Sequence, residues 1–206
     1  MLKIWGRLSS VNVQKVVWAV RELALPHTLT QVGGQYGGLD TPEYGKMNPN
    51  RKVPVIDDGG LVLWESNAIV RYLAARYGEG SLWPTDVALR AHADRWMDWT
   101  ATEWQPAVAP AFLGLVRTPE AQRDAAAIEA SAHKANALAL MLEDALQQRE
   151  FIAGAHLTMG DVVLGCVAHR WLGTPIERPA TPALSAWYRR LMMRPATQGV
   201  LTLPLS

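Results

Sequence analysis

The sequence has 206 residues, of which 49% are hydrophobic and 19% charged, with a formal net charge of +1 at pH 7. This composition is typical of a globular protein and excludes an intrinsically disordered chain. The 20 basic residues are interspersed with 19 acidic ones, so we expect no nucleic-acid partner. No apolar run approaches the ~20 residues that span a bilayer, and the apolar stretch at the N-terminus is shorter than a signal peptide needs. These features predict a cytoplasmic protein without a membrane partner.

The first 80 residues alternate strand and helix signals. Valines recur at helical spacing after residue 12, which indicates an amphipathic helix between two short β-like runs. The turn sequence DDGG joins two further apolar runs into an expected hairpin. This order is that of a thioredoxin-like α/β domain over residues 1–80, with a parallel β-α-β part and an antiparallel hairpin. The expected elements are a strand at 2–5, a helix at 11–23, a strand at 25–32, a hairpin at 53–64 and a helix at 66–78.

Residues 86–206 carry helix signals only and predict an all-α C-terminal domain. A long alanine-rich helix has Thr118 as its expected N-cap and Pro119 at its first position. Thr158 and Asp161 form a carboxylate variant of the capping box. Because the linker between the two domains is short, we expect them to pack together. The expected helices cover 86–104, 118–148, 157–172 and 181–195.

Pro54 stands directly before an apolar run of the expected hairpin. A proline at the start of a strand removes no ladder hydrogen bond, so strand initiation alone explains it. Only about 5–6% of X–Pro bonds are cis, but a thioredoxin-like domain places a cis proline just before its third strand. A cis Val53–Pro54 bond would turn the N–H and C=O of Val53 outward, toward a peptide-like ligand. We therefore predict the cis form.

Glu65 and Ser66 end the second apolar run of the hairpin. Ser66 alone is explained as the N-cap of the following helix, but a charged residue at the end of an apolar strand is not. Free N–H groups at a helix N-terminus bind a carboxylate, and a neighbouring glutamate binds an ammonium group. The pair therefore fits both charges of one amino-acid head group, and Lys52 adds a cation for a second carboxylate. These residues predict a small-peptide ligand.

The segments NPNRKVPVIDD and LWESNAIVRYLA resemble the glutathione-binding half of cytosolic glutathione S-transferases. The capping box in LTMGD resembles that of the helical half of the same family, so the resemblance covers the whole chain. It is nearest to bacterial, theta-like members with a catalytic serine. The resemblance implies glutathione as co-substrate, with its cysteinyl backbone paired to Val53 beside Pro54. It further implies a γ-glutamyl head group on Glu65 and Ser66 and a glycyl carboxylate near Lys52.

The resemblance also places the catalytic residue in GRLSSVNVQ, between the first strand and the first helix. A hydroxyl group and free N–H groups there favour a thiolate, because a free thiol has a pKa of about 8.5. The spacing to the segment ELALP favours Ser10, with Ser9 as the alternative, and plain helix capping accounts for either serine. Asn12 stands where the serine classes often carry a proline. It either donates a hydrogen bond near the sulfur or caps the first helical turn.

Leu8 and Trp104 are the residues that we expect to line the pocket of the electrophile. Leu8 lies in the loop before the catalytic serine. Trp104 belongs to an aromatic stripe at helical spacing, and such a stripe is more often part of a hydrophobic core or a dimer contact.

Cys166 is the only cysteine, which excludes a disulfide within the chain and an all-cysteine metal site. We expect no metal. Residues 6–14 contain no cysteine, so thiol–disulfide exchange of the thioredoxin or glutaredoxin kind is disfavoured. Cys166 lies in an apolar helical segment, where a buried structural thiol is expected.

The resemblance implies a detoxifying transferase that conjugates glutathione to small hydrophobic or halogenated electrophiles, such as haloalkanoates or aryl halides. A second hypothesis is a glutathione-dependent isomerase of the maleylacetoacetate type. It is disfavoured because Asn12 stands where that group carries a cysteine. A third is a non-catalytic ligand-binding protein of the same fold, disfavoured because Val53–Pro54 and Glu65–Ser66 are intact. The resemblance also implies a homodimer.

Overall fold

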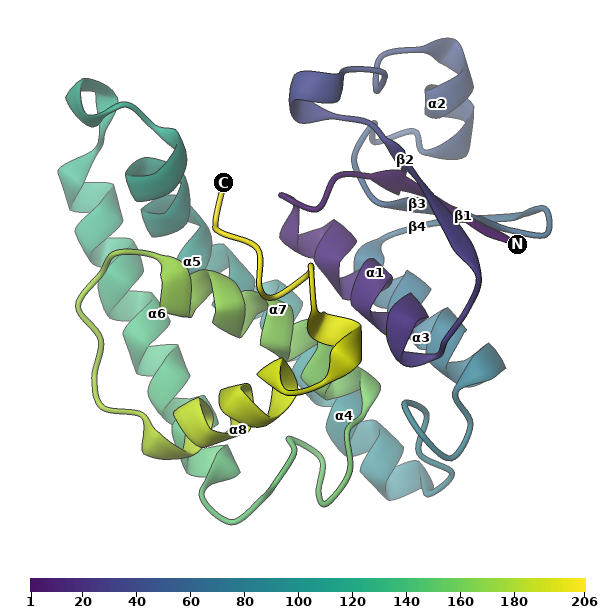
Figure 1. Cartoon of the computed structure of the whole chain (residues 1–206). Helices are drawn as coiled ribbons and strands as arrows, with labels where there is room; N and C mark the ends of the chain where they lie inside the picture. The colour runs from purple at the N-terminus through teal and green to yellow at the C-terminus, as the bar shows by residue number, and fades with distance from the viewer.

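The computed structural model describes all 206 residues and begins with a four-stranded sheet of order β2-β1-β3-β4 (Figure 1). β1 runs parallel to β2 and antiparallel to β3, and β3 and β4 form the antiparallel hairpin. The predicted thioredoxin-like arrangement is therefore confirmed. The strands are β1 (Leu2–Gly6), β2 (His27–Gln31), β3 (Val55–Asp58) and β4 (Leu61–Trp64). The helices of this region are α1 (Val11–Glu22), α2 (Pro42–Met47) and α3 (Ser66–Tyr77).

The rest of the chain is helical, as predicted (Figure 1). π-helical turns at Thr100–Trp104 and Leu113–Arg117 precede and follow α5. None of the helices is both long enough and apolar enough to cross a membrane. The helices are α4 (Val87–Trp99), α5 (Gln105–Phe112), α6 (Ala125–Leu146), α7 (Met159–Gly173) and α8 (Pro182–Met192).

The capping box at the start of α7 is confirmed. Oδ2 of Asp161 accepts hydrogen bonds from the N–H and the hydroxyl of Thr158, both at 2.9 Å. Oδ1 accepts from the N–H of Ile152 at 2.8 Å and from Nε1 of Trp187 at 2.9 Å. Because Asp161 is fully buried, this one carboxylate joins the start of α7 to the preceding loop and to α8.

The two regions share one hydrophobic core, in which α1 packs against both α3 and α7. α1 and α7 pack tightly at Gly165, where a Cβ atom would lie 2.7 Å from the ring of Trp18. Trp18 itself is fully buried. The loop before α1 is therefore held at the boundary between the sheet region and the helical region.

The predicted start of the alanine-rich helix at Thr118 is wrong, because α6 begins at Ala125. Asp124 is its N-cap and accepts from the N–H of Ala127 at 3.0 Å. The hydroxyl of Thr118 instead donates to the C=O of Leu113 at 3.0 Å. Thr118 therefore ends the π-helical turn Leu113–Arg117. The next long helix, α6, begins only after Asp124.

Candidate active site

The loop between β1 and α1 places Ser10 at the N-cap of α1. The backbone of Ser10 is extended, and its C=O accepts from the N–H groups of Val13 and Gln14, both at 3.0 Å. Its hydroxyl makes no capping hydrogen bond, and the N–H groups of Val11 and Asn12 have no partner in the chain. Ser10 thus caps the helix through its main chain alone. Its hydroxyl is left free at the positive end of the helix dipole.

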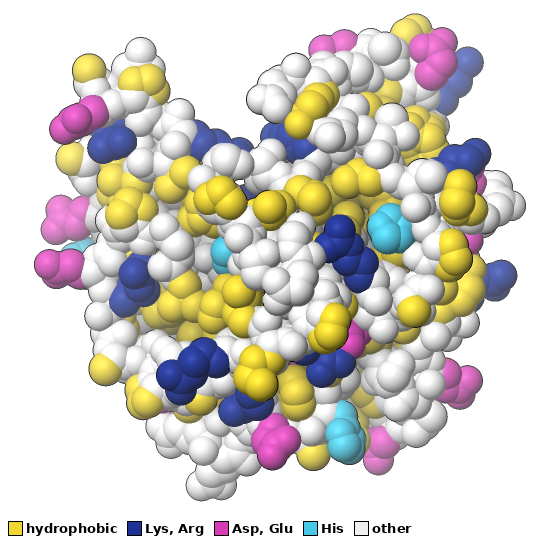
Figure 2. All heavy atoms as spheres, viewed as in Figure 1, with side chains coloured by type: hydrophobic (Ala, Val, Ile, Leu, Met, Phe, Trp, Pro, Cys, Tyr) yellow, Lys and Arg dark blue, Asp and Glu magenta, His cyan; other side chains and the backbone are white.

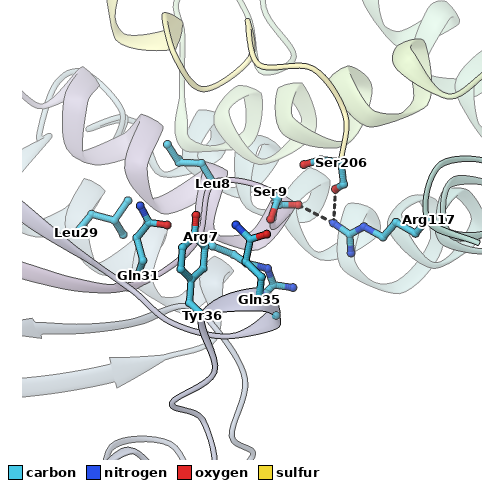
Figure 3. A pocket seen from close by; sticks show the side chains of 10 residues that line it. Arg7, Leu8, Ser9, Leu29, Gln31, Gln35, Tyr36, Arg117 and Ser206 are labelled. Carbon is cyan, nitrogen blue, oxygen red and sulfur yellow. Dashed lines mark hydrogen bonds between the residues drawn. The ribbon is translucent and has the colours of Figure 1, made fainter.

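Ser9, the alternative candidate, lines a cavity of about 660 Å³ that lies between the β1–α1 loop, the segment 29–36 and, from the helical region, Arg117 and Ser206 (Figure 3). The C=O of Ser9 accepts from Nη2 of Arg117 at 2.9 Å, and the same Nη2 donates to the main-chain oxygen of Ser206. The hydroxyl of Ser9 makes no hydrogen bond within the protein. Both serine hydroxyls are therefore available, and the choice of Ser10 stays a prediction.

The Val53–Pro54 peptide bond is cis, as predicted. The C=O of Lys52 accepts hydrogen bonds from the hydroxyl of Tyr44 and from Nδ2 of Asn48, both at 2.8 Å. These bonds fix the backbone directly before Val53. The N–H and C=O of Val53 have no partner in the chain, and the side chain of Lys52 is exposed. The segment therefore presents a free main-chain donor and acceptor next to a free cation.

Glu65, and not Ser66, is the N-cap of α3, which corrects the prediction by one residue. The C=O of Glu65 accepts the first helical bond, from the N–H of Ile69 at 2.9 Å. The φ of Glu65 is 70°, a value that residues other than glycine rarely adopt. Strain of this kind costs ~1–3 kcal/mol and is concentrated at functional sites. The Glu65 carboxylate is exposed, whereas Ser66 is buried as the first residue of α3.

A chain of polar side chains connects α1, α3 and α5 within two turns of Ser10. Nζ of Lys15 donates to Oε1 of Gln105 at 2.6 Å and to Oδ1 of Asn67 at 3.4 Å. Nε2 of Gln105 donates to Oδ1 of Asn12 at 3.2 Å. The side chain of Asn12 therefore does not cap the helix, and its Nδ2 has no hydrogen-bond partner in the protein. The network links the first turn of α1 to the N-termini of α3 and α5.

Lys15 is only 1% exposed and has amide oxygens as its hydrogen-bond acceptors. Burial lowers the pKa of Lys15 to about 8, and the charge of Arg170 also lowers it, while Cys166 and Glu65 raise it. Burial raises the pKa of the Cys166 thiol to about 12, in agreement with the expected structural role of this cysteine. Lys15 was not among the site residues predicted from the sequence.

Leu8 lines the cavity (Figure 3), and its expected place in the electrophile pocket stays a prediction. Trp104 does not line the cavity, because its side chain is fully buried. Nε1 of Trp104 donates to the C=O of Ala135 at 3.3 Å, and its ring packs against Trp99 and Trp171. The position of Trp104 thus supports the other explanation of the aromatic stripe, a hydrophobic core.

Family models match both regions of the chain. The N-terminal domain model of glutathione S-transferases matches residues 9–76, and the C-terminal domain model matches residues 125–190. The chain belongs to the glutathione S-transferase family. As a member of this family, it is also similar over its whole length to glutathione S-transferase GstB of Escherichia coli K12. The two are 38% identical, and the match covers 100% of both chains.

Theta-class members are also similar to this glutathione S-transferase. The theta-1 enzyme of Rattus norvegicus is 33% identical over 93% of this chain and 82% of its own length. The solved structure of a theta-class glutathione S-transferase from Xanthomonas axonopodis pv. citri, with glutathione bound, has a TM-score of 0.96. That structure is 47% identical and the match covers 100% of this chain and 99% of the other. The predicted family and fold, and the resemblance to bacterial theta-like members, are thereby confirmed.

Proposed function

We propose that the chain conjugates glutathione to small electrophiles, with the hydroxyl of Ser10 donating a hydrogen bond to the glutathione thiolate. The observation that carries this proposal is the free hydroxyl of Ser10 at a helix N-cap where the first two N–H groups are also free. Donors at this position lower the pKa of a bound thiol, because they stabilise its anion and leave the neutral thiol unaffected. The names of the similar proteins support the transferase reaction.

Glutathione binding is assigned to the segments on either side of the β3–β4 hairpin. The free N–H and C=O of Val53 pair with the cysteinyl backbone, and the exposed ammonium group of Lys52 binds the glycyl carboxylate. Glu65 binds the γ-glutamyl ammonium group, and Ser66 binds the carboxylate beside it. The positive φ of Glu65 supports this role, because such strain persists where a side chain must point at a ligand.

In the proposed reaction the thiolate attacks an electrophilic carbon and displaces a leaving group, as in haloalkanoates or aryl halides. A carbon–sulfur bond forms, the carbon–halogen bond breaks, and the halide departs with the electron pair. The thiol proton leaves for solvent when the thiolate forms. The protein stabilises the thiolate and holds the electrophile beside it, in the cavity that Leu8 lines.

We propose that the protein is a homodimer, that it acts in the cytoplasm, and that the reaction detoxifies the electrophiles. The isomerase and the non-catalytic binding protein find no comparable support, since the relatives at 38% and 47% identity that match over the whole chain are named transferases.

The test is an ultraviolet absorbance titration of glutathione bound to the wild type and to Ser10→Ala and Ser9→Ala. We expect the wild type to hold the thiol pKa below its free value of about 8.5. Ser10→Ala should return the pKa toward that value and reduce kcat/KM by about 10²-fold, as expected for loss of one donor to a reacting anion. Ser9→Ala should keep the wild-type pKa. The opposite result for the two variants would assign the role to Ser9, and no shift in any of the proteins would remove the serine mechanism.

A further inference from the structure

The side chains of Lys15, Gln105 and Asn12 form a chain of hydrogen bonds in which every donor points the same way. Nζ of Lys15 donates to Oε1 of Gln105, and Nε2 of Gln105 donates to Oδ1 of Asn12. The chain thus runs from the middle of α1 across to α5 and back to the first turn of α1. It ends at Nδ2 of Asn12, a free N–H donor two residues after Ser10.

The ammonium group of Lys15 fixes this direction. An ammonium group donates hydrogen bonds and accepts none, so only the amide oxygen of Gln105 can face it. The amide nitrogen of Gln105 then faces Asn12, and because this nitrogen is also only a donor, it can meet only the oxygen of Asn12. Lys15 is charged at neutral pH, because burial lowers its pKa no further than about 8. One buried charge therefore decides which atom of Asn12 is left without a partner.

Asn67 on α3 supports the same arrangement from a second helix. Its Nδ2 donates to the C=O of Met97 at 2.8 Å. Because a carbonyl group only accepts, this bond turns Oδ1 of Asn67 toward Nζ of Lys15, at 3.4 Å. Two amide oxygens from different helices thus accept from the ammonium group, and both favour the charged form of Lys15.

The free Nδ2 of Asn12 is accessible beside Ser10. The buried side-chain atoms without a hydrogen-bond partner are Nε1 of Trp96 and Nε of Arg170, so Nδ2 of Asn12, which also has no partner, reaches the surface. Side chains of an α-helix lean toward its N-terminus, where the hydroxyl of Ser10 is also free. The loop that leads into α1 lies along one side of a notch between the sheet region and the helical region (Figure 2). Nδ2 therefore lies at the end of α1 where the thiolate is expected.

We propose that Gln105 is a positioning residue, held by Lys15, that keeps Nδ2 of Asn12 pointing at the sulfur of bound glutathione. The inference rests on the proposed function and extends it to the helical region. A donor held in this direction stabilises the thiolate, and the aligned hydrogen bonds polarise one another in the same sense. An Asn12 amide that turned round would instead place Oδ1 beside the sulfur and repel the thiolate.

Gln105→Met tests the proposal, because methionine keeps the length and the neutral charge of the side chain and removes both hydrogen bonds. The pKa of the bound glutathione thiol, measured by thiolate absorbance, should rise by about half a pH unit. Affinity for the neutral thiol, measured by calorimetry well below that pKa, should stay the same, whereas structural damage to the site would weaken it. An unchanged thiol pKa would overturn the proposal.

Gln147→Met is the matched control for this substitution. Nε2 of Gln147 also donates to a side-chain oxygen, Oδ1 of Asp144 at 3.2 Å, but near the end of α6. The thiol pKa should be that of the wild type in this variant. Lys15→Met removes the charge that fixes the chain and should raise the thiol pKa while Gln105 is intact. An unchanged pKa in Lys15→Met would overturn the role assigned to the ammonium group.

A double-mutant cycle with Asn12→Ala shows whether Gln105 acts through Asn12. Asn12→Ala alone should raise the thiol pKa about as much as Gln105→Met does. In the double variant Gln105→Met should add no further rise, because the donor that Gln105 positions is already absent. A full further rise would show that Gln105 affects the sulfur by another route, and it would overturn the positioning role.

NMR of the isotope-labelled wild type with glutathione gives a readout that needs no substitution in the network. The side-chain amide signals of Asn12 should shift as the bound thiol ionises, with the same pKa as the absorbance titration. Signals that do not follow the thiol would overturn the proposal. A thiol pKa that responds to Ser10→Ala but not to Gln105→Met would overturn the positioning role and leave the proposed function standing. A wild type that does not lower the thiol pKa would remove both.

Discussion

Nζ of Lys15 lies 2.6 Å from Oε1 of Gln105, in the buried contact between α1 and α5. Lys15 belongs to the sheet region and Gln105 to the helical region, so this hydrogen bond crosses the boundary between them. An ammonium group held by amide oxygens alone is not fully compensated for the loss of its hydration. The buried ammonium group of Lys15, in the contact between the two regions, therefore lowers the free energy of unfolding.

The stability of the wild type should rise between about pH 8 and pH 10.5 relative to the variant Lys15→Met. Above the folded-state pKa of about 8 the native lysine is neutral, while the unfolded lysine still binds its proton up to its ordinary pKa of 10.5. Because the unfolded state then binds more protons, the free energy of unfolding increases with pH in this window, and Lys15 adds no pH dependence below it. Urea unfolding should show a relative gain on the order of 2–3 kcal/mol.

Lys134→Met is the control for this series, because the side chain of Lys134 is 59% exposed. Its unfolding free energy should differ from that of the wild type by a constant amount across the same pH range. A constant difference for Lys15→Met as well would show that Lys15 keeps its proton in the folded protein.

The order of the strands and of six helices was predictable, because their signals are local, whereas α2 and α5 were not expected. The DDGG turn does join β3 to β4, and Gly78 follows the last residue of α3. The cis Val53–Pro54 bond was predictable only through the fold, since the dipeptide itself favours trans. The segments proposed to bind glutathione were likewise identified through the fold. They lie at the ends of strands and helices whose order is that of a thioredoxin-like domain.

Lys15 and Arg117 could not be predicted from sequence patterns. Lys15 lies in a helix that is buried around most of its circumference, whereas periodicity assigns a lysine to the solvent face. Arg117 meets Ser9 across 108 positions of sequence, a contact that only the folding of the helical region onto α1 creates. The start of α6 was misplaced because Thr118 has the residue type of an N-cap but bonds backward to Leu113.

Asn12→Asp should raise the pKa of the bound glutathione thiol. Oδ1 of Asn12 is bonded to Gln105, so the free Nδ2 is the group left to face a ligand. A carboxylate of the same shape removes that donor and repels a nearby thiolate. The acidic limb of the kcat/KM profile for the electrophile, measured at saturating glutathione, should shift upward by about one pH unit, and Asn12→Ala should shift it less. Asn136→Asp, whose Nδ2 is already bonded to Glu177, is the control and should leave the profile unchanged. An unshifted profile in Asn12→Asp would place Asn12 away from the sulfur.

Asp161→Ala should destabilise the protein by more than ~3 kcal/mol, since each buried donor left without an acceptor costs about 1–3 kcal/mol. The donors that would lose their acceptor belong to Ile152, Thr158 and Trp187. Asp124→Ala is the matched control, because Asp124 caps α6 at the surface through one bond, and its loss should cost about 1 kcal/mol. Urea unfolding measures both, and similar costs would show that the Asp161 network is not a major source of stability.

Glu65→Gly should stabilise the fold and weaken glutathione binding at the same time. The φ of 70° at Glu65 costs a side chain ~1–3 kcal/mol, and glycine adopts it without strain. After the ~0.5–1 kcal/mol that glycine loses in conformational entropy on folding, a net gain of about 1 kcal/mol is expected.

Glu65→Ala separates backbone strain from the carboxylate, because alanine keeps the strain and removes the charge. It should therefore weaken glutathione binding about as much as Glu65→Gly, by about 10-fold or more, without the gain in stability. Calorimetry and urea unfolding on both variants check the two effects independently. Equal stabilisation by alanine would show that the gain comes from removing the charge, and unchanged affinity in both would exclude Glu65 from the binding of the γ-glutamyl group.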